Sequence, residues 1–179
     1  MVDDRIGLIL HERGDGTEEL LMQFAFDLLD KGVNVGGLVQ RSVRGPTGKN
    51  IMDLIDIRTK DEFRISQDLG AGSDACSLDP AGLAEASQVL RREIESGVAL
   101  LVVNKFSGAE CSGEGLAAET FEAIAQGIPV ITSLAVRYQD DWNLLTESAG
   151  TLLQPNLAAL WSWWTGLTQA TALEQEIQL

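Results

Sequence analysis

The sequence predicts a three-layer α/β domain, in which a mostly parallel β-sheet is flanked by helices. Short apolar runs alternate with amphipathic segments, which is the pattern of repeated β-α-β units. The run Val98–Val103 is apolar at every position, as expected for a central strand buried on both faces. The chain has 179 residues, which is enough for one ordinary domain with a single core.

The N-terminal part predicts a strand, a polar turn and a helix. The apolar run 6–10 forms the strand, and residues 11–17 form the turn. The helix covers residues 18–31, where apolar residues repeat at the spacing of one helical face: Leu21, Phe24, Ala25 and Leu28. Two glutamates in the first turn suit the helix dipole, and Gly32 ends the helix.

The next apolar runs predict one longer strand and two shorter ones. The longer strand covers 33–39, and the shorter strands at 50–57 and 63–66 flank turns and suit an antiparallel excursion. Sequence alone does not show whether this excursion joins the main sheet. Asp79-Pro80 then supplies an N-cap and a first-turn proline for a helix that runs to about Ser96.

The second half of the chain continues the alternation. After Val98–Val103, a glycine-rich turn over 104–115 leads into a helix that Gly127 ends. A strand over 128–131 follows, and Asp140-Asp141-Trp142 opens a short helix.

We expect one domain over residues 1–154 and a helical tail over 155–179. The tail places apolar residues at helical spacing: Leu157, Leu160, Trp161 and Trp164. This pattern favours packing on the domain or across a dimer seam. A homodimer formed through the Trp-rich segment is therefore one expected arrangement.

The composition limits the classes of partner. Acidic residues outnumber basic ones by 27 to 13, and the net charge of −14 argues against nucleic acid or an anionic membrane as a main partner. The sequence has no run of about 18 apolar residues and no secretory pattern near Met1, so we expect a cytoplasmic protein of bacterial type. Cys76, Cys111 and the single histidine, His11, are too few for a disulfide framework or a zinc site.

Ligands of open α/β sheets bind at the carboxyl ends of the strands. Four predicted loops lie there: 11–17, 40–49, 104–115 and 132–140. From Glu93 to the C-terminus the only basic residues are Lys105 and Arg137, and both directly follow a predicted strand. With Arg13 in the first loop, they would place positive charge at one rim of an acidic protein and attract an anion.

The loop before the first helix occupies the place of a phosphate-binding loop. Aligning Gly14 and Gly16 with the loop glycines puts Thr17 where the Walker lysine belongs and Glu18 where the Mg²⁺-binding Ser or Thr belongs. Carboxylates in the first helical turn also repel a triphosphate. We therefore expect a degenerate phosphate loop that does not support ordinary ATP hydrolysis.

The most unusual stretch is the glycine-rich turn over 104–115. Its glycines allow a close backbone approach to a ligand, and Asn104 stands where P-loop enzymes often place the acidic residue linked to Mg²⁺. Glu110 could act as a base or as the partner of Lys105. The alternative is a turn held by an asparagine side chain and a Lys–Glu pair.

Three other features are expected to be structural. Gly45–Asn50 contains a Gly-Lys pair but is expected to be a turn, because a strand pattern rather than a helix follows it. Cys76 would need a nearby base to act as a nucleophile, and His11 is the only imidazole. Asp140 and Asp141 suit helix capping better than a carboxylate dyad.

The residues Asn104-Lys105-Phe106, Glu110 and Gly113-x-Gly115-Leu116 resemble the Asn-[Lys/Arg]-Phe-Gly-x-x-Glu-x-x-Gly-x-Gly-Leu signature of a bacterial domain family of unknown function. Further matches spread over residues 5 to 150: Gly37–Gln40, Ile65–Gly70, Cys76-x-Leu78-Asp79-Pro80, Gly127–Val130 and Asp141-Trp142. The resemblance implies a P-loop NTPase-like (Rossmann-like) topology with a degenerate phosphate loop. The family is described as nucleotide-binding, NTPase-like or associated with molybdenum (molybdate) transport. The chain departs from the signature at Ser107, where the family has Gly, and at Ala109, where a basic residue is common.

Our leading interpretation is a ligand-binding or regulatory protein that holds a nucleotide or a small oxyanion such as molybdate at this rim without efficient hydrolysis. Mg²⁺ would matter only if a nucleotide binds, and no catalytic residue or metal ligand is assigned. The expected ligand-binding residues are Arg13, Gly14, Gly16, Asn104, Lys105, Phe106, Ser107, Glu110, Gly113, Gly115 and Arg137. Two alternatives stay open: a Mg²⁺-dependent nucleoside triphosphatase with a non-standard phosphate loop, and a protein-interaction module that uses the Trp-rich tail.

Overall fold

The computed structural model describes residues 4–67, 69 and 78–177. The strands are β1 (Ile6–His11), β2 (Val35–Arg44), β3 (Asn50–Asp56), β4 (Glu62–Arg64), β5 (Leu100–Phe106), β6 (Val130–Ala135) and β7 (Thr151–Leu153). The helices are α1 (Thr17–Asp30), α2 (Pro80–Ser96), α3 (Gly108–Cys111), α4 (Ala117–Ala125), α5 (Gln139–Thr146) and α6 (Leu157–Ile177), with a 3-10 turn η1 (Val136–Tyr138). Cys76, considered as a nucleophile from the sequence, lies outside the described residues, as do residues 68, 70 and 76–77 of the matching segments.

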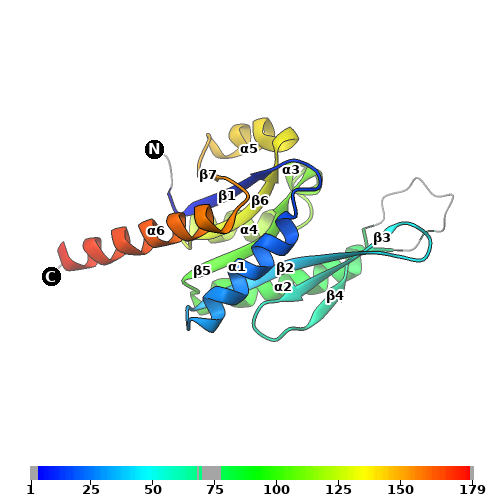
Figure 1. Ribbon diagram of the computed structural model, residues 1–179, viewed down its shortest axis with the longest axis horizontal. Coiled ribbons are helices and arrows are strands. Elements are labelled where there is room, and N and C mark those ends of the chain that lie inside the picture. The colour runs from blue at the N-terminus through cyan, green and yellow to red at the C-terminus, as the bar shows by residue number, and fades with distance from the viewer. Residues whose placement is uncertain (1–3, 68, 70–77, 178–179) are drawn as a thin grey trace.

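The strands form one sheet in the order β4-β3-β2-β5-β6-β1-β7 (Figure 1). The pairs β2–β5, β5–β6, β6–β1 and β1–β7 are parallel. The pairs β2–β3 and β3–β4 are antiparallel. The antiparallel excursion predicted from the sequence therefore joins the main sheet at the β2 edge. This mostly parallel sheet confirms the predicted α/β class.

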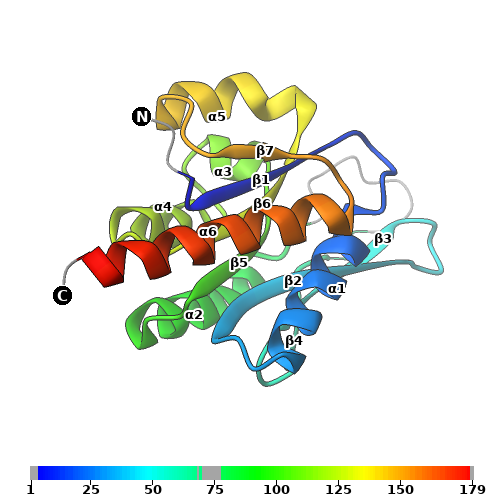
Figure 2. The same cartoon turned by 60° about the vertical axis from the view of Figure 1, so that its left-hand side comes forward.

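Helices cover both faces of the sheet, as Figures 1 and 2 show. Along β5, Leu100 and Val102 belong to the core beneath α1 and α6, whereas Leu101 and Val103 belong to the core beneath α2 and α4. Because successive side chains of a strand point to opposite faces, this alternation places the two helix pairs on opposite sides. The result is the expected three-layer arrangement.

The Trp-rich segment packs on the α1 side of the sheet. Trp163 and Trp164 are each 9% exposed and belong to the same core cluster as the apolar residues of α1. Trp161 meets Phe24 of α1 edge-to-face, with ring centroids 5.1 Å apart. The C-terminal part of α6 extends past the body of the domain (Figure 1), and Leu173 there is 61% exposed.

Several strands are longer than the sequence patterns predict. The prediction that a loop begins at Asn104 is wrong, because β5 continues to Phe106, whose ring lies 4.9 Å from that of Trp142 in the core. Likewise β2 extends to Arg44 and β6 to Ala135, so the predicted loops 40–49 and 132–140 are shorter. Pairing with neighbouring strands keeps these partly polar segments extended.

The sequence patterns also miss β7 and α3. Three residues at a sheet edge are too short to show a periodic pattern, and α3 depends on hydrogen bonds within its own loop.

An ion network ties the β3–β4 turn to α2 at the end of the sheet far from the predicted rim. The buried carboxylate of Asp56 accepts from Arg92 at 2.8 Å and from the backbone N–H of Arg58 at 2.8 Å. Glu93, also buried, accepts from Arg58 at 2.7 Å and from Arg92. A Cβ atom at position 36 would overlap the Glu93 carboxylate, so Gly36 is required where β2 meets this network.

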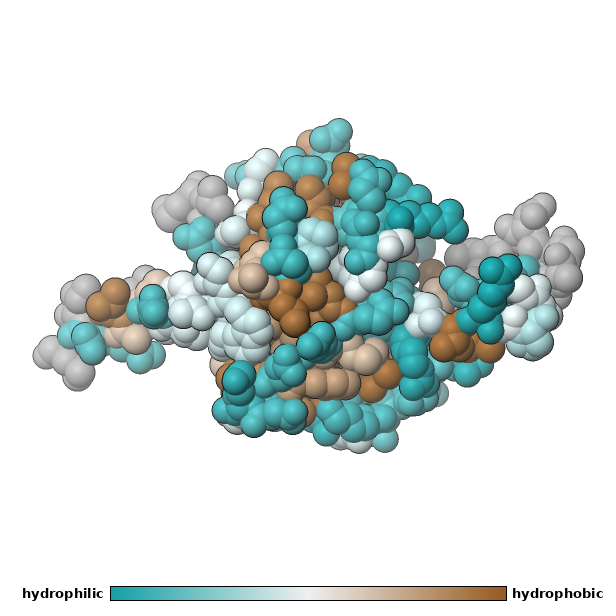
Figure 3. Space-filling model, in the orientation of Figure 1, coloured by the Kyte–Doolittle hydropathy of each residue, from teal (hydrophilic) through white to brown (hydrophobic). Residues whose placement is uncertain are grey.

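Within the described residues, no helix is long and apolar enough to cross a membrane. Hydrophilic residues cover most of the face shown in Figure 3, and apolar residues are visible near its middle.

Candidate functional site

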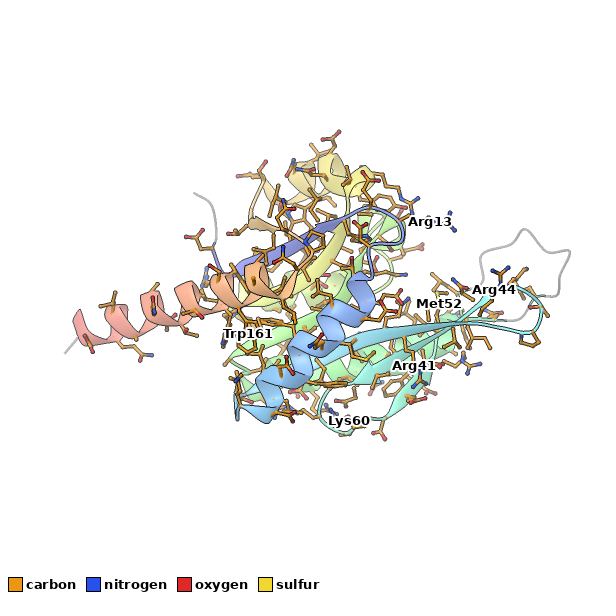
Figure 4. The ribbon with its side chains drawn as sticks, in the orientation of Figure 1. Arg13, Arg41, Arg44, Met52, Lys60 and Trp161 are labelled. Carbon is orange, nitrogen blue, oxygen red and sulfur yellow. The ribbon has the colours of Figure 1, made fainter. Side chains whose placement is uncertain are left out.

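The carboxyl ends of β1 and β6 lie side by side and hold a hollow between the loops that follow them. The two strands pair in parallel up to His11 and Ala135, so their loops leave the sheet at the same rim. The hollow has a volume of ≈ 520 Å³ and is lined by His11, Glu12, Arg13, Ala135, Val136 and Arg137. Figure 4 shows Arg13 on the turn that follows β1.

Three nitrogen-bearing side chains line this hollow. Arg13 is exposed, and within the described part of the chain neither Arg13 nor Arg137 forms an ion pair. The guanidinium of Arg137 lies over the ring of Tyr138, 4.8 Å from its centroid. His11 donates through Nδ1 to the carbonyl oxygen of Glu12 at 3.1 Å. Two guanidinium groups with no carboxylate partner can bind an anion there.

The N-terminus of α1 is surrounded by carboxylates of its own loop. Gly16 is the N-cap with φ 66°, and no side chain caps the helix there. The backbone N–H of Glu12 already donates to Asp15 Oδ2 at 2.8 Å. Glu18 and Glu19 occupy the first turn. The loop therefore lies where a phosphate loop would lie, between β1 and α1, but it offers a triphosphate mostly negative charge.

A chain of side-chain hydrogen bonds runs beneath the first turn of α1. Asn104 of β5 donates through Nδ2 to Gln40 Oε1 at 2.9 Å, and Gln40 of β2 donates through Nε2 to Glu18 Oε1 at 2.7 Å. Gln40 also donates to Ser42 Oγ at 3.1 Å. Gln40 and Asn104 are buried, with exposed fractions of 3% and 7%.

Two atoms beside this chain have no hydrogen-bond partner among the described residues. They are Asn104 Oδ1 and the hydroxyl oxygen of the buried Thr17, the first residue of α1. A third such atom is Thr132 Oγ1 on β6. Buried polar atoms normally find a partner, so the interior around these atoms is polar but incompletely satisfied.

The loop after β5 is held by Glu110. Its Oε2 accepts from the backbone N–H of Ser107 at 2.9 Å and from the Ser107 hydroxyl at 2.7 Å, and its Oε1 accepts from the N–H of Leu116 at 3.2 Å. A Cβ atom at Gly115 would overlap Glu110 Oε1, so glycine permits this approach. The carboxylate thus organises the loop and does not pair with Lys105 in the structure.

The structure brings together only some of the residues predicted to bind a ligand. Arg13 and Arg137 line one hollow, and Gly14 and Gly16 lie in the loop beside it with φ of 92° and 66°. The other predicted residues lie in or after β5. Of these, Asn104 joins the buried chain, Phe106 is in the core, Ser107, Glu110 and Gly115 shape the loop, Gly113 has φ 78°, and Lys105 is half-buried outside the hollow.

Gln40 and Thr17 contribute to the buried chain and its surroundings but were not predicted as site residues. Gln40 carries a detectable signal, because it is a polar residue at the end of the apolar run 33–39. Thr17 carries no such sequence signal, since threonine is common in polar turns.

Three comparisons relate this chain to known proteins. The model of a family described as "Protein of unknown function (DUF2478)" matches residues 6–163. The molybdenum import ATP-binding protein ModC 2 of Bradyrhizobium diazoefficiens is 40% identical over 162 residues, which are 90% of this chain. The chain spans only 18% of the length of that relative.

Among solved structures, the solution structure of a human cancer-related nucleoside triphosphatase matches with a TM-score of 0.63. The match covers 93% of this chain and 97% of that chain at 15% sequence identity. At this identity the likeness concerns the fold alone, and it confirms the predicted P-loop NTPase-like architecture.

Proposed function

This chain belongs to the DUF2478 family of proteins of unknown function, and from that premise we propose that it binds a small oxyanion, free or as the phosphate group of a nucleotide, without efficient hydrolysis. The ligand would lie in the hollow at the ends of β1 and β6, against Arg13 and Arg137. The observation that carries the proposal is the pair of guanidinium groups that have no carboxylate partner among the described residues, in a protein of net charge −14. Because the protein is so acidic, positive charge at one rim attracts an anion to that rim.

The residues do not fit a Mg²⁺-bound nucleoside triphosphate, which the P-loop-like fold would suggest. Thr17 replaces the lysine that would bind the β- and γ-phosphates, and Glu18 replaces the hydroxyl residue that would bind Mg²⁺. The Glu18 carboxylate is engaged by Gln40 in addition. Efficient hydrolysis from this loop is therefore not part of the proposal.

The relatives suggest which oxyanions to test. ModC 2 of Bradyrhizobium diazoefficiens is named for molybdenum import and ATP binding, and the human structure is named as a nucleoside triphosphatase. Molybdate and the phosphate group of a nucleotide share the tetrahedral oxyanion chemistry that two guanidinium groups recognise. We propose molybdate as the first candidate and the nucleotide as the second.

The proposal is tested by thermal shift and titration calorimetry at low salt with molybdate, tungstate, sulfate, phosphate, ADP and ATP. A ligand present at about 100 times its Kd should add about 2.7 kcal/mol of stability, which raises Tm by several degrees. A response to the free oxyanions and not to the nucleotides would identify a free oxyanion as the ligand. A response to ADP and ATP alone would identify a nucleotide. Steady phosphate release from ATP would instead support the Mg²⁺-dependent triphosphatase.

Arginine variants locate the site. We expect Arg13→Ala and Arg137→Ala each to weaken binding by about 10-fold or more, because a charge-assisted hydrogen bond contributes about 1.5–3 kcal/mol. Arg44→Ala is the matched control, because Arg44 is an exposed arginine on the β2–β3 hairpin, outside the hollow (Figure 4). Equal affinity in all three variants and the wild type would contradict the proposal.

The interaction-module alternative has less structural support. Trp163 and Trp164 lie in the core of their own chain rather than on a free surface. A partner that recognises the tail would have to use the exposed part of α6 beyond them.

A further inference from the structure

We infer that the Glu18–Gln40–Asn104 chain occupies the place of a divalent cation, so that the proposed oxyanion binds without one. This inference rests on the proposed function for its anion, but its claim about the cation can be tested without any anion. It concerns the interior of the protein beneath α1, not the arginine pair at the rim.

The direction of the hydrogen bonds in this chain is fixed by its ends. A carboxylate only accepts, so the Gln40 group 2.7 Å from Glu18 Oε1 must be its NH₂. The Gln40 oxygen then faces Asn104, which must present its own NH₂ at 2.9 Å. The Glu18 carboxylate thus accepts a hydrogen bond from the Gln40 amide, and Asn104 holds that amide in place.

The donor set argues against a tightly held divalent cation. Mg²⁺ prefers carboxylate and phosphate oxygens in octahedral geometry, and an amide oxygen is a weaker ligand. The three hydrogen-bonded side chains include a single carboxylate, that of Glu18. One oxygen of this carboxylate already accepts a hydrogen bond from Gln40. No cluster of three or more His, Cys, Asp or Glu side chains that could hold a metal occurs among the described residues.

The unpartnered oxygens of Asn104 and Thr17 fit this arrangement. The direction of the chain turns Asn104 Nδ2 toward Gln40 and leaves Oδ1 as a buried acceptor, and Thr17 Oγ1 is buried and unpartnered at the adjoining helix end. Both atoms can accept a hydrogen bond from water or from a neutral donor group. Both are neutral oxygens, which add to a Mg²⁺ coordination shell only where carboxylate or phosphate oxygens supply the charge.

The first experiment compares wild-type protein in EDTA, in Mg²⁺ and in Na⁺ at matched ionic strength, without anion. We expect the same Tm in all three. We then expect the affinity for molybdate or phosphate, measured by calorimetry, to be the same in EDTA and in Mg²⁺. A rise in wild-type Tm with Mg²⁺, or tighter anion binding in Mg²⁺, would overturn the inference.

The second experiment restores a carboxylate. Asn104→Asp places a buried negative charge beside Gln40, in addition to that of Glu18. We therefore expect a lower Tm in EDTA and a gain of several degrees on adding Mg²⁺. Asn50→Asp makes the same change at an exposed position of β3 and should give no response to Mg²⁺. A wild type that responds to Mg²⁺ as strongly as Asn104→Asp would contradict the replacement.

The two proposals fail in different ways. If no oxyanion or nucleotide binds in either buffer, the proposed function fails, while the Mg²⁺ experiment without anion still decides the inference. If an anion binds at Arg13 and Arg137 only when Mg²⁺ is present, the proposed function stands and the inference fails. Should Asn104→Asp fail to fold, the wild-type comparison in EDTA and Mg²⁺ decides the inference by itself.

Discussion

Glu110 shows how one buried carboxylate can organise a glycine-rich loop without a ligand. Its two oxygens accept three hydrogen bonds, two from Ser107 and one from the N–H of Leu116. The side chain is 6% exposed, so breaking these bonds would leave a buried charge unsatisfied. Glu110 therefore has a structural role that does not depend on any bound molecule.

A pair of glycine variants tests this role. Gly115→Ala should lower the free energy of unfolding by about 2–4 kcal/mol, because its φ of 63° is strained for alanine and its Cβ would displace the Glu110 carboxylate. Gly113→Ala is the control, since its φ of 78° carries similar strain but its Cβ would meet open space. We expect a cost of only about 1–2 kcal/mol there. Equal losses in urea unfolding would mean that the contact with Glu110 adds nothing.

Some candidate site residues can be identified from the sequence, but their arrangement in space cannot. The loop glycines and Arg13, Arg137 and Asn104 can be identified as candidates from their positions after predicted strands. Their separation into a basic hollow and a buried amide chain depends on which strands are neighbours. That order is set by long-range pairing, which one sequence does not display.

At the scale of elements, α2 is joined to the β3–β4 turn by charged side chains rather than by apolar contact alone. Burial by itself raises the pKa of Asp56, but hydrogen bonds from Arg92 and from the backbone N–H groups of Arg58 and Thr59 outweigh it, and the net pKa is lowered. Hydrogen bonds to Glu93 and Asp56 in turn raise the pKa of Arg92. The ionised network thus holds the antiparallel arm, formed by β3 and β4, against α2.

The pH dependence of stability follows from the lowered pKa. Because the folded pKa of Asp56 lies below its unfolded value near 3.8, its contribution is complete above that value and is lost as pH falls through the folded pKa. Asp56→Asn should cost about 2 kcal/mol at neutral pH and lose less stability than the wild type on further acidification. Asp30→Asn, an exposed change at the end of α1, should keep the wild-type acid profile in urea unfolding. A wild-type profile in Asp56→Asn would refute the assignment.

The elements themselves are largely predictable, and their ends are not. Helices α1, α2 and α6 follow from apolar spacing and from caps such as Asp79, whose side chain accepts from Ala81 N–H as expected. The predicted ends of β2 and β5 are misplaced, because polar residues such as Gln40 and Asn104 are typical of loops. The two side chains instead form a hydrogen bond with each other between neighbouring strands.

Across the whole molecule, carboxylates outnumber basic side chains by 27 to 13. Many basic side chains form ion pairs on or near β3 and β4, as in Arg41 with Glu62 at 2.7 Å and Arg64 with Asp53 at 2.5 Å. The excess of carboxylates gives the chain its net charge of −14. Mutual repulsion of these charges opposes the compact state.

The salt dependence of stability tests this balance. Screening of the repulsion should raise the midpoint of urea unfolding as NaCl increases from low to physiological ionic strength, where the Debye length is about 8 Å. Sucrose at matched osmolality serves as the control for effects that do not involve charge. A midpoint that falls with NaCl would show that the ion pairs of the arm outweigh the repulsion.

The position of β1 in the sheet has a consequence for the order in which the protein can fold during synthesis. Both neighbours of β1 come from late in the chain, since Ile6–His11 pairs with Val130–Ala135 and Gly7–Ile9 pairs with Thr151–Leu153. During synthesis, β1 therefore cannot form its sheet contacts until β6, more than 100 residues later, has been made. Such distant pairing slows folding and leaves β1 exposed to misassembly or chaperones in the meantime.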